Sequence, residues 1–184
     1  MQHSMTSVSS PSAEVRIIAS GLEFPEGPIS LPDGSVLVTE IAAGTLATVS
    51  PDGSRLYVAE TQVARVWYWD LDGPGQIAAN ADGRFHPGKL LYGAPGYVLF
   101  DSMKVDGDGW VCQATLVDGG VTQISPDGQT VETLLLSDPM VTNLCFGGPD
   151  HRTAFITCSG TGHLIAVDWP RAGGRLAFPG TERT

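Results

Sequence analysis

The sequence has few charged residues, and basic ones are particularly scarce. Only 16% of its 184 residues are charged, and 10 Lys and Arg stand against 20 Asp and Glu, giving a formal net charge of −10. An acidic surface repels phosphate backbones and is compatible with cation capture. We therefore expect no nucleic-acid partner.

Long apolar runs and paired cysteines are also missing. No run approaches the roughly 20 apolar residues that a membrane-spanning helix needs, so we expect no membrane partner. Residues 1–14 lack the apolar core of an export signal, and we interpret them as a disordered tail before a single domain at 15–184. The cysteines Cys112, Cys145 and Cys158 are odd in number and lack CxxC spacing. Buried free thiols and a cytoplasmic location are expected from this pattern.

Helical periodicity is almost absent, and short β-rich runs take its place. They include SVLVTE, TLATVS, RLYVAE, RVWYWD, GWVCQA, TAFITC and HLIAVDW. Turns such as LPDG, SPDG and DLDG separate them, supplying the positive-φ position that a tight hairpin requires. Many hairpin-linked strands indicate an all-β antiparallel sandwich, barrel or propeller.

Three segments share one spacing, in which an oxygen-bearing side chain stands seven residues before an aspartate in a turn. The pairs are Glu26 with Asp33, Asp101 with Asp108, and Asn143 with Asp150. The last two repeats are 42 residues apart, which fits a four-stranded propeller blade. The first strand of each blade lines the central channel, so equivalent positions converge at its mouth. The spacing predicts that Glu26, Asp101 and Asn143 lie close together.

Three longer motifs resemble the gluconolactonase, regucalcin (senescence marker protein) and luciferin-regenerating enzyme family. They are GLEFPEGPISLPDGSVLVTE, LYVAETQVARVWYWDLDGPG and VTNLCFGGPDHRTAFITC. The resemblance implies a propeller that binds one divalent cation on its axis and hydrolyses sugar lactones or related esters. It also implies that Glu26 is a metal ligand and that Asp101 is both a ligand and the general base. Asn143 is a channel-lining or substrate candidate.

The metal implied by the resemblance is most simply calcium. Carboxylate and amide oxygens are hard ligands, which favour calcium or magnesium over softer metals. Zinc, manganese and iron are the remaining alternatives.

The chain departs from the family pattern after TLATVSPDG. Two blades that normally follow, including a substrate-contacting segment and a third-ligand segment, are absent, and the chain continues directly into SRLYVAET. We therefore expect an internal deletion near 53–55 and a reduced propeller of about four antiparallel four-stranded blades instead of six. Either RLYVAE pairs with TLATVS as a replacement outer strand and the ring shrinks, or two chains form a homodimer and complete each other's ring.

The function expected from these features is metal-dependent hydrolysis of a small-molecule lactone. In this hypothesis Asp101 takes a proton from a metal-activated water. The alternative is a non-catalytic β-repeat protein that binds calcium or acts as a scaffold. Glu40 and Glu60 end strands at equivalent positions, and we expect both to be structural.

Overall fold

The structure is a computed structural model that describes residues 25–30, 36–40, 45–73, 76–79 and 88–174, with side chains from residue 47 onward within these ranges. The expected tail at 1–14 lies outside them. The described residues form strands β1 to β14 and no helix, so the all-β prediction is confirmed. Within this part of the chain, no helix has the length and apolar character needed to cross a membrane.

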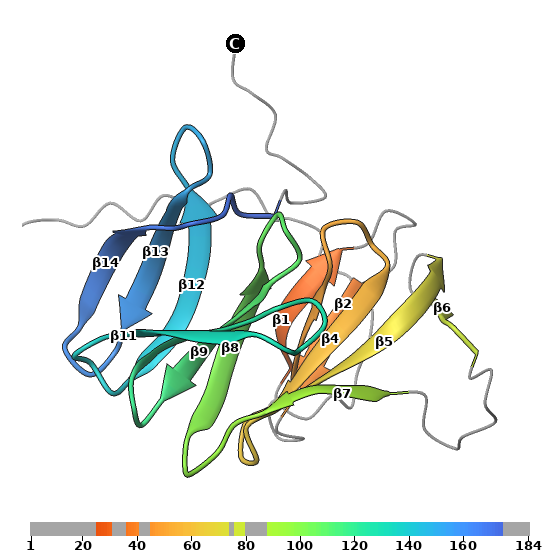
Figure 1. Cartoon of the computed structure of the whole chain (residues 1–184), viewed down its shortest axis with the longest axis horizontal. Coiled ribbons are helices and arrows are strands. Elements are labelled where there is room, and N and C mark those ends of the chain that lie inside the picture. The colour runs from red at the N-terminus through yellow and green to blue at the C-terminus, as the bar shows by residue number, and fades with distance from the viewer. Residues whose placement is uncertain (1–24, 31–35, 41–44, 74–75, 80–87, 175–184) are drawn as a thin grey trace, which may run out of the picture.

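The strands form four antiparallel sheets that follow chain order (Figure 1). The first sheet contains β1 (Pro25–Ser30) and β2 (Val36–Glu40). The second contains β3 (Thr45–Val49), β4 (Arg55–Glu60), β5 (Arg65–Gly73), β6 (Gln76–Ile77) and β7 (Lys89–Gly93), with β6 and β7 both paired to β5. The third contains β8 (Leu99–Val105), β9 (Val111–Leu116), β10 (Gly120–Ile124) and β11 (Val131–Leu135). The fourth contains β12 (Val141–Gly147), β13 (Thr153–Cys158) and β14 (His163–Asp168).

The first strands of successive sheets lie next to one another. β3 contacts β8, and β8 contacts β12, while β1 and β2 both contact β3. The sheets therefore succeed one another as repeated units around their first strands (Figure 1). Among the described residues, the expected four-stranded unit is complete in β8–β11.

The expected join between TLATV and RLYVAE is a regular hairpin. β3 pairs with β4 from Thr45 opposite Glu60 to Val49 opposite Leu56. The first strand of this sheet is thus the segment that precedes the join, and β4 follows it in unbroken register. The prediction that these two segments pair is confirmed.

The turn at this join repeats the turn between β10 and β11. The Ser50 hydroxyl donates to Asp52 at 2.6 Å and accepts the N–H of Arg55 at 2.9 Å. The same two bonds at residues 125–130 also measure 2.6 and 2.9 Å. A Ser-Pro-Asp-Gly turn therefore sets the register of β4 as it sets that of β11.

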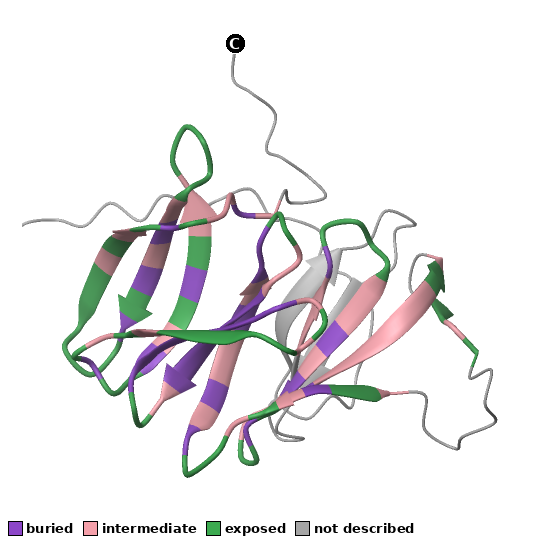
Figure 2. Cartoon of the chain, in the orientation of Figure 1, coloured by how far each residue is buried: buried purple, intermediate pink, exposed green. Residues whose placement is uncertain are grey.

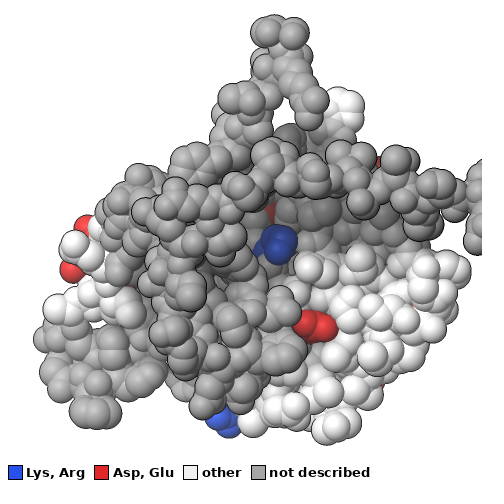
Figure 3. All heavy atoms as spheres, turned by 180° about the vertical axis from the view of Figure 1, so that it is seen from behind, with Lys and Arg blue, Asp and Glu red and all other residues white. Residues whose placement is uncertain are grey.

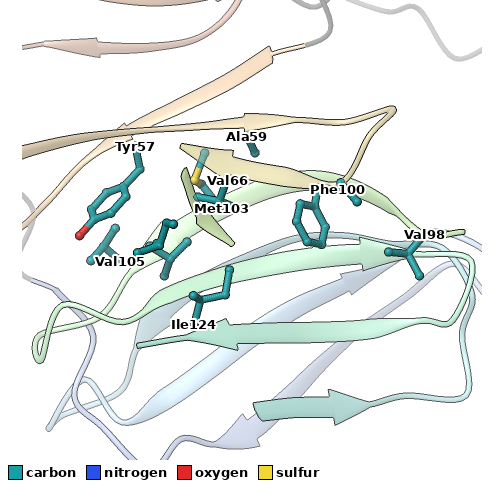
Figure 4. Close-up of a cluster of buried hydrophobic side chains, with 11 residues drawn as sticks. Tyr57, Ala59, Val66, Val98, Phe100, Met103, Val105 and Ile124 are labelled. Atoms are coloured by element: carbon teal, nitrogen blue, oxygen red, sulfur yellow. The ribbon is translucent and has the colours of Figure 1, made fainter. Parts of the chain in front are cut away.

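Two apolar clusters cover the two faces of the third sheet. Figure 4 shows the first, in which Phe100, Met103 and Ile124 of this sheet meet Tyr57 and Val66 of the second sheet. The other cluster lies between the third and fourth sheets. Side chains alternate across a strand, so β9 supplies both clusters. Buried residues are accordingly concentrated in β8–β10 (Figure 2).

The segment after β14 is attached to the third sheet by a buried ion pair. Arg171 Nε lies 2.5 Å from a carboxylate oxygen of Asp106, whose side chain is 0% exposed. The guanidinium also donates to Gln123 and lies 4.1 Å from the ring centroid of Trp110. Asp106 accepts backbone N–H groups as well, so its charge is fully engaged.

Replacing Arg171 by methionine should destabilise the protein strongly. The substitution leaves the buried charge of Asp106 without its cation, and breaking a buried pair from one side costs about 3–5 kcal/mol. Urea denaturation monitored by tryptophan fluorescence measures the free energy of unfolding. Arg65→Met, at an exposed position, is the matched control. Equal losses for both variants would contradict the assigned role of the pair.

Asp52 should make the stability of the join dependent on pH. Hydrogen bonds from Ser50, followed by those from Ser54, lower the pKa of Asp52 to about 2. Its stabilising effect is therefore fully present above the unfolded-state pKa of about 4 and is lost as the pH falls through about 2. Asp52→Asn should lower Tm at pH near 6, and the difference from wild type should shrink between pH 4 and 2. A Tm difference that is constant with pH would refute this explanation.

Candidate functional site

The predicted residues Asp101 and Asn143 lie near the starts of two contacting strands, β8 and β12. Leu99 at the start of β8 pairs with Leu116, and Leu116 forms a bridge to Met140 just before β12. The two strands consequently begin at the same end of their sheets. We call this end the site face. Asp101 and Asn143 therefore lie on contacting strands that begin at this end, and the close approach of their side chains stays a prediction.

A β-bulge accompanies each of the three repeat-equivalent residues. The register shifts lie between Glu26 and Ile29 in β1, between Phe100 and Met103 in β8, and between Val141 and Asn143 in β12. Bulges re-aim side chains and are over-represented beside active sites. Alternation of apolar residues did not reveal them, because a bulge inserts a residue without changing the composition of the strand.

Glu26 lies in β1, where its backbone pairs with Thr39. Its side chain is outside the described part of the chain. Because β3 contacts both β1 and β8, β3 stands between the strand of Glu26 and that of Asp101. The predicted approach of Glu26 to Asp101 therefore stays a prediction.

Asp101 occupies the bulge of β8 and is half-buried. The side-chain amide of Gln113, from the neighbouring strand β9, donates to its backbone oxygen at 2.6 Å. The same nitrogen lies 3.2 Å from the backbone oxygens of Ser102 and Ala114. Gln113 is therefore a part of the site that sequence reasoning missed.

Asn143 is exposed, and its amide oxygen is already used locally. Asn143 Oδ1 accepts the backbone N–H of Leu144 at 2.8 Å. Its backbone oxygen accepts a bond from the Thr157 hydroxyl at 3.3 Å. This places Asn143 on the surface of the fourth sheet that faces away from the third sheet.

The donor set has the right chemistry for a hard cation. Asp101 offers a carboxylate, the ligand type that calcium and magnesium prefer. The described residues include no group of three or more His, Cys, Asp or Glu side chains that could hold a metal. A full ligand set would therefore require Glu26 in addition.

Asp138 is a second acidic residue on the site face, and its role is to fix loops. Its carboxylate accepts the N–H of Met140 at 2.7 Å, and the N–H and hydroxyl of Thr161, both at 2.6 Å. The bond from the Thr161 hydroxyl is the main cause of the lowered pKa of Asp138. This carboxylate thereby connects the loop before β12 to the β13–β14 turn. Its oxygens are occupied by protein donors.

In the rear view of Figure 3, the acidic and basic side chains of the described residues lie apart from one another. One half-buried cation, Lys104, lies on β8 three residues beyond Asp101, and burial lowers its pKa. Cys145 of β12, an exposed thiol, opposes this lowering. The expectation of three buried thiols is therefore wrong for Cys145, although Cys112 and Cys158 are buried and all three are free.

An open hollow of about 430 Å³ lies at the opposite end of the sheets, beside the join. It is lined by the turn at 50–54, the β8–β9 turn and Pro126. Arg55 is its basic group, and it is occupied by Asp70 at 3.3 Å and by the backbone oxygen of Pro126 at 2.8 Å. The hollow is thus separate from Asp101, which lies at the other end of β8.

The model of the SMP-30/Gluconolactonase/LRE-like region matches residues 41–160. The chain belongs to this family. It is 32% identical over 142 residues to a 6-deoxy-6-sulfogluconolactonase of Pseudomonas putida, covering 75% of this chain and 46% of that protein. It is 28% identical over 130 residues to a pentonolactonase of Haloferax volcanii, covering 70% of this chain and 43% of that protein. The chain thus spans less than half the length of these relatives.

Solved structures show the same fold. A calcium-binding regucalcin from Agrobacterium tumefaciens matches with a TM-score of 0.56 at 22% identity, covering 78% of this chain and 54% of that one. A luciferin-regenerating enzyme matches with a TM-score of 0.59 at 23% identity, covering 79% and 53%. The resemblance read from the sequence is confirmed, together with the antiparallel all-β architecture.

Proposed function

We propose that this chain is a divalent-cation-dependent lactone hydrolase in which Asp101 is the general base. The observation that carries the proposal is the placement of Asp101, half-buried in the bulge of β8 on the site face. Membership of a family with relatives named as lactonases supports a small-molecule lactone as the substrate.

Asp101 has two roles in this proposal. It accepts a proton from the water that attacks the lactone carbonyl, and it shares a cation with Glu26. When bound, calcium or magnesium supplies positive charge that stabilises the developing oxyanion. Asn143 lies on the neighbouring strand as a substrate or channel-lining residue. The seven-residue spacing that Glu26 and Asp101 share supports their joint assignment.

The second candidate is a non-catalytic calcium-binding or scaffold protein. Two observations favour it. The chain spans less than half of its lactonase relatives, and Asn143 is exposed with its amide oxygen accepting the backbone N–H of Leu144. A site with fewer oriented groups binds a cation more readily than it catalyses a reaction, because catalysis requires finer positioning.

Lactone hydrolysis separates the two candidates. The protein should release acid from gluconolactone or a simple γ-lactone in the presence of calcium, and EDTA should abolish the release. Asp101→Asn should lower kcat by roughly 100-fold or more, because it removes the base. Asp127→Asn, an exposed carboxylate in a turn, is the matched control and should keep wild-type activity.

Calcium binding completes this test. A cation held at 100 times its Kd stabilises the folded state by about 2.7 kcal/mol, which thermal unfolding detects. Glu26→Ala and Asp101→Asn should lose this stabilisation. Stabilisation without turnover would establish the non-catalytic candidate, and wild-type stabilisation in Glu26→Ala would remove Glu26 from the site.

We also infer that two chains associate through the outer face of the fourth sheet. On this face Asn143 pairs with Thr157 and Leu164, and Cys145 pairs with Phe155 in the next row. Leu164 is 69% exposed. The third sheet, by contrast, has an apolar cluster on each face. A repeat unit with one face uncovered is completed by another unit, and a second copy supplies one.

Sedimentation velocity and thiol labelling test this association. The wild-type chain should sediment as a dimer, with Cys145 protected from a thiol reagent. Leu164→Lys should yield a monomer in which Cys145 reacts ~10-fold faster, equivalent to about 1.4 kcal/mol of protection. Leu90→Lys, at a 52% exposed site in the second sheet, is the control. A wild-type monomer with a freely reactive Cys145 would overturn the inference.

A further inference from the structure

Gln113 is a polar residue in the middle of the most buried sheet. It lies in β9, and its side chain is completely buried. Its strand neighbour Val111, which shares its face of the sheet, belongs to the apolar cluster between the second and third sheets. A long amide here loses side-chain entropy and its hydrogen bonds to water on folding, whereas an apolar residue has no such bonds to lose and gains from leaving water. The site on β9 therefore holds a residue that packing alone does not favour.

The amide of Gln113 is used by the bulge that carries Asp101. Between the pairs Phe100–Thr115 and Met103–Gln113, two residues of β8 lie opposite one residue of β9. A bulge of this kind interrupts the hydrogen-bond ladder locally. The Gln113 nitrogen lies within bonding distance of both bulge carbonyls, at 2.6 and 3.2 Å. One side chain thereby replaces the missing ladder partners of Asp101 and Ser102.

The other end of the same amide has no hydrogen-bond partner among the described residues. Gln113 Oε1 is buried and unsatisfied, while the nitrogen is placed among three backbone oxygens. Those three acceptors fix the orientation of the amide, because turning it over would set its oxygen against them. An orphaned buried acceptor opposes folding, so the bonds to the bulge are formed at the expense of stability. Local costs of this type collect at functional sites.

We propose that Gln113 is the positioning residue for Asp101. It holds the two-residue bulge of β8 and so fixes the direction of the Asp101 carboxylate at the site face. Gln113 acts through the backbone and does not touch the substrate. This role rests on the proposed function of Asp101, since a correctly aimed carboxylate matters only if it binds a cation or moves a proton.

The consequence of losing the amide follows from strand geometry. Without it, the half-buried carbonyls of Asp101 and Ser102 lose the donor that replaces the ladder bond, and the bulge can respond by moving along β8. Side chains alternate faces with a period of two, so a shift of one residue turns Asp101 to the other face of the sheet. If the shift did not extend beyond Ser102, the core residue Met103 would remain in place. The protein would then stay folded while the carboxylate was misdirected.

The test compares Gln113→Met and Gln113→Glu with Thr115→Val. Methionine keeps the length of the side chain and removes both its donors. Thr115 is the matched control, because it is buried on the same face of β9 and its hydroxyl bonds to Thr122 at 2.8 Å and to the backbone oxygen of Gln113 at 3.1 Å, not to the bulge carbonyls. Gln113→Met should lower kcat for the lactone by roughly 100-fold, the scale of a misplacement of about 1 Å, with little change in KM. Thr115→Val should keep the wild-type kcat.

The glutamate variant gives a readout that a purely structural role does not predict. A neutral carboxylic acid donates one hydrogen bond to the bulge, whereas an ionised one repels its carbonyls. Burial raises the pKa of a carboxyl group, so the protonated fraction of the introduced glutamate increases as the pH falls from about 8 to about 6. The kcat of Gln113→Glu relative to Gln113→Met should therefore rise over this range. A ratio that is constant with pH would count against the proposal.

Amide hydrogen exchange separates this proposal from the proposed function. Exchange at Ser102 and Met103, measured without substrate, should be at least ~10-fold faster in Gln113→Met than in Thr115→Val. If the wild type hydrolyses no lactone and binds no calcium, the proposed function fails, and this exchange still reports whether Gln113 holds the bulge. Unchanged exchange together with unchanged kcat would overturn the positioning role. If Gln113→Met does not fold, Gln113→Glu at low pH supplies the same comparison.

Discussion

The hydrogen-bonded turn at residues 50–55 is the constraint on which the rest of the structure depends. It joins β3 to β4, and its Ser50 and Asp52 bonds repeat those of the β10–β11 turn. Because a one-residue slip would move every side chain of β4 to the other face, the turn decides whether Tyr57 enters the core. With β4 in this register, β3 lies against β8 as the first strand of its sheet.

The two ends of the third sheet differ in their chemistry. At one end, bulges, the Gln113 amide and the loops held by Asp138 surround the starts of β8 and β12. At the other, Arg171 and Asp106 close the sheet with a buried ion pair. Stability is thus concentrated away from Asp101. The site face holds an irregular strand pairing at β8 and the unsatisfied side-chain oxygen of Gln113, as expected where orientation matters more than stability.

Sequence alone predicted the repeated features and missed the irregular ones. Hairpin turns and alternating strands predicted an all-β fold, and the motifs identified the family. The seven-residue spacing placed Asp101 and Asn143 on contacting strands. It did not predict the bulges, because their cause is the pairing between strands rather than the composition of either strand. For the same reason Gln113 passed unnoticed, and Cys145 was expected to be buried although it lies on the open face of the fourth sheet.

The open face and the positioning of Asp101 are linked through β8 and β12. β8 is covered on both sides, so its bulge is held between the amide of Gln113 and an apolar cluster. Among the described residues β12 packs against the third sheet on one side, and the amide oxygen of Asn143 accepts the backbone N–H of Leu144. Asp101 and Asn143 therefore differ in how firmly they are held. Closing the array over β12 would remove water from Asn143 and strengthen any electrostatic contact made there.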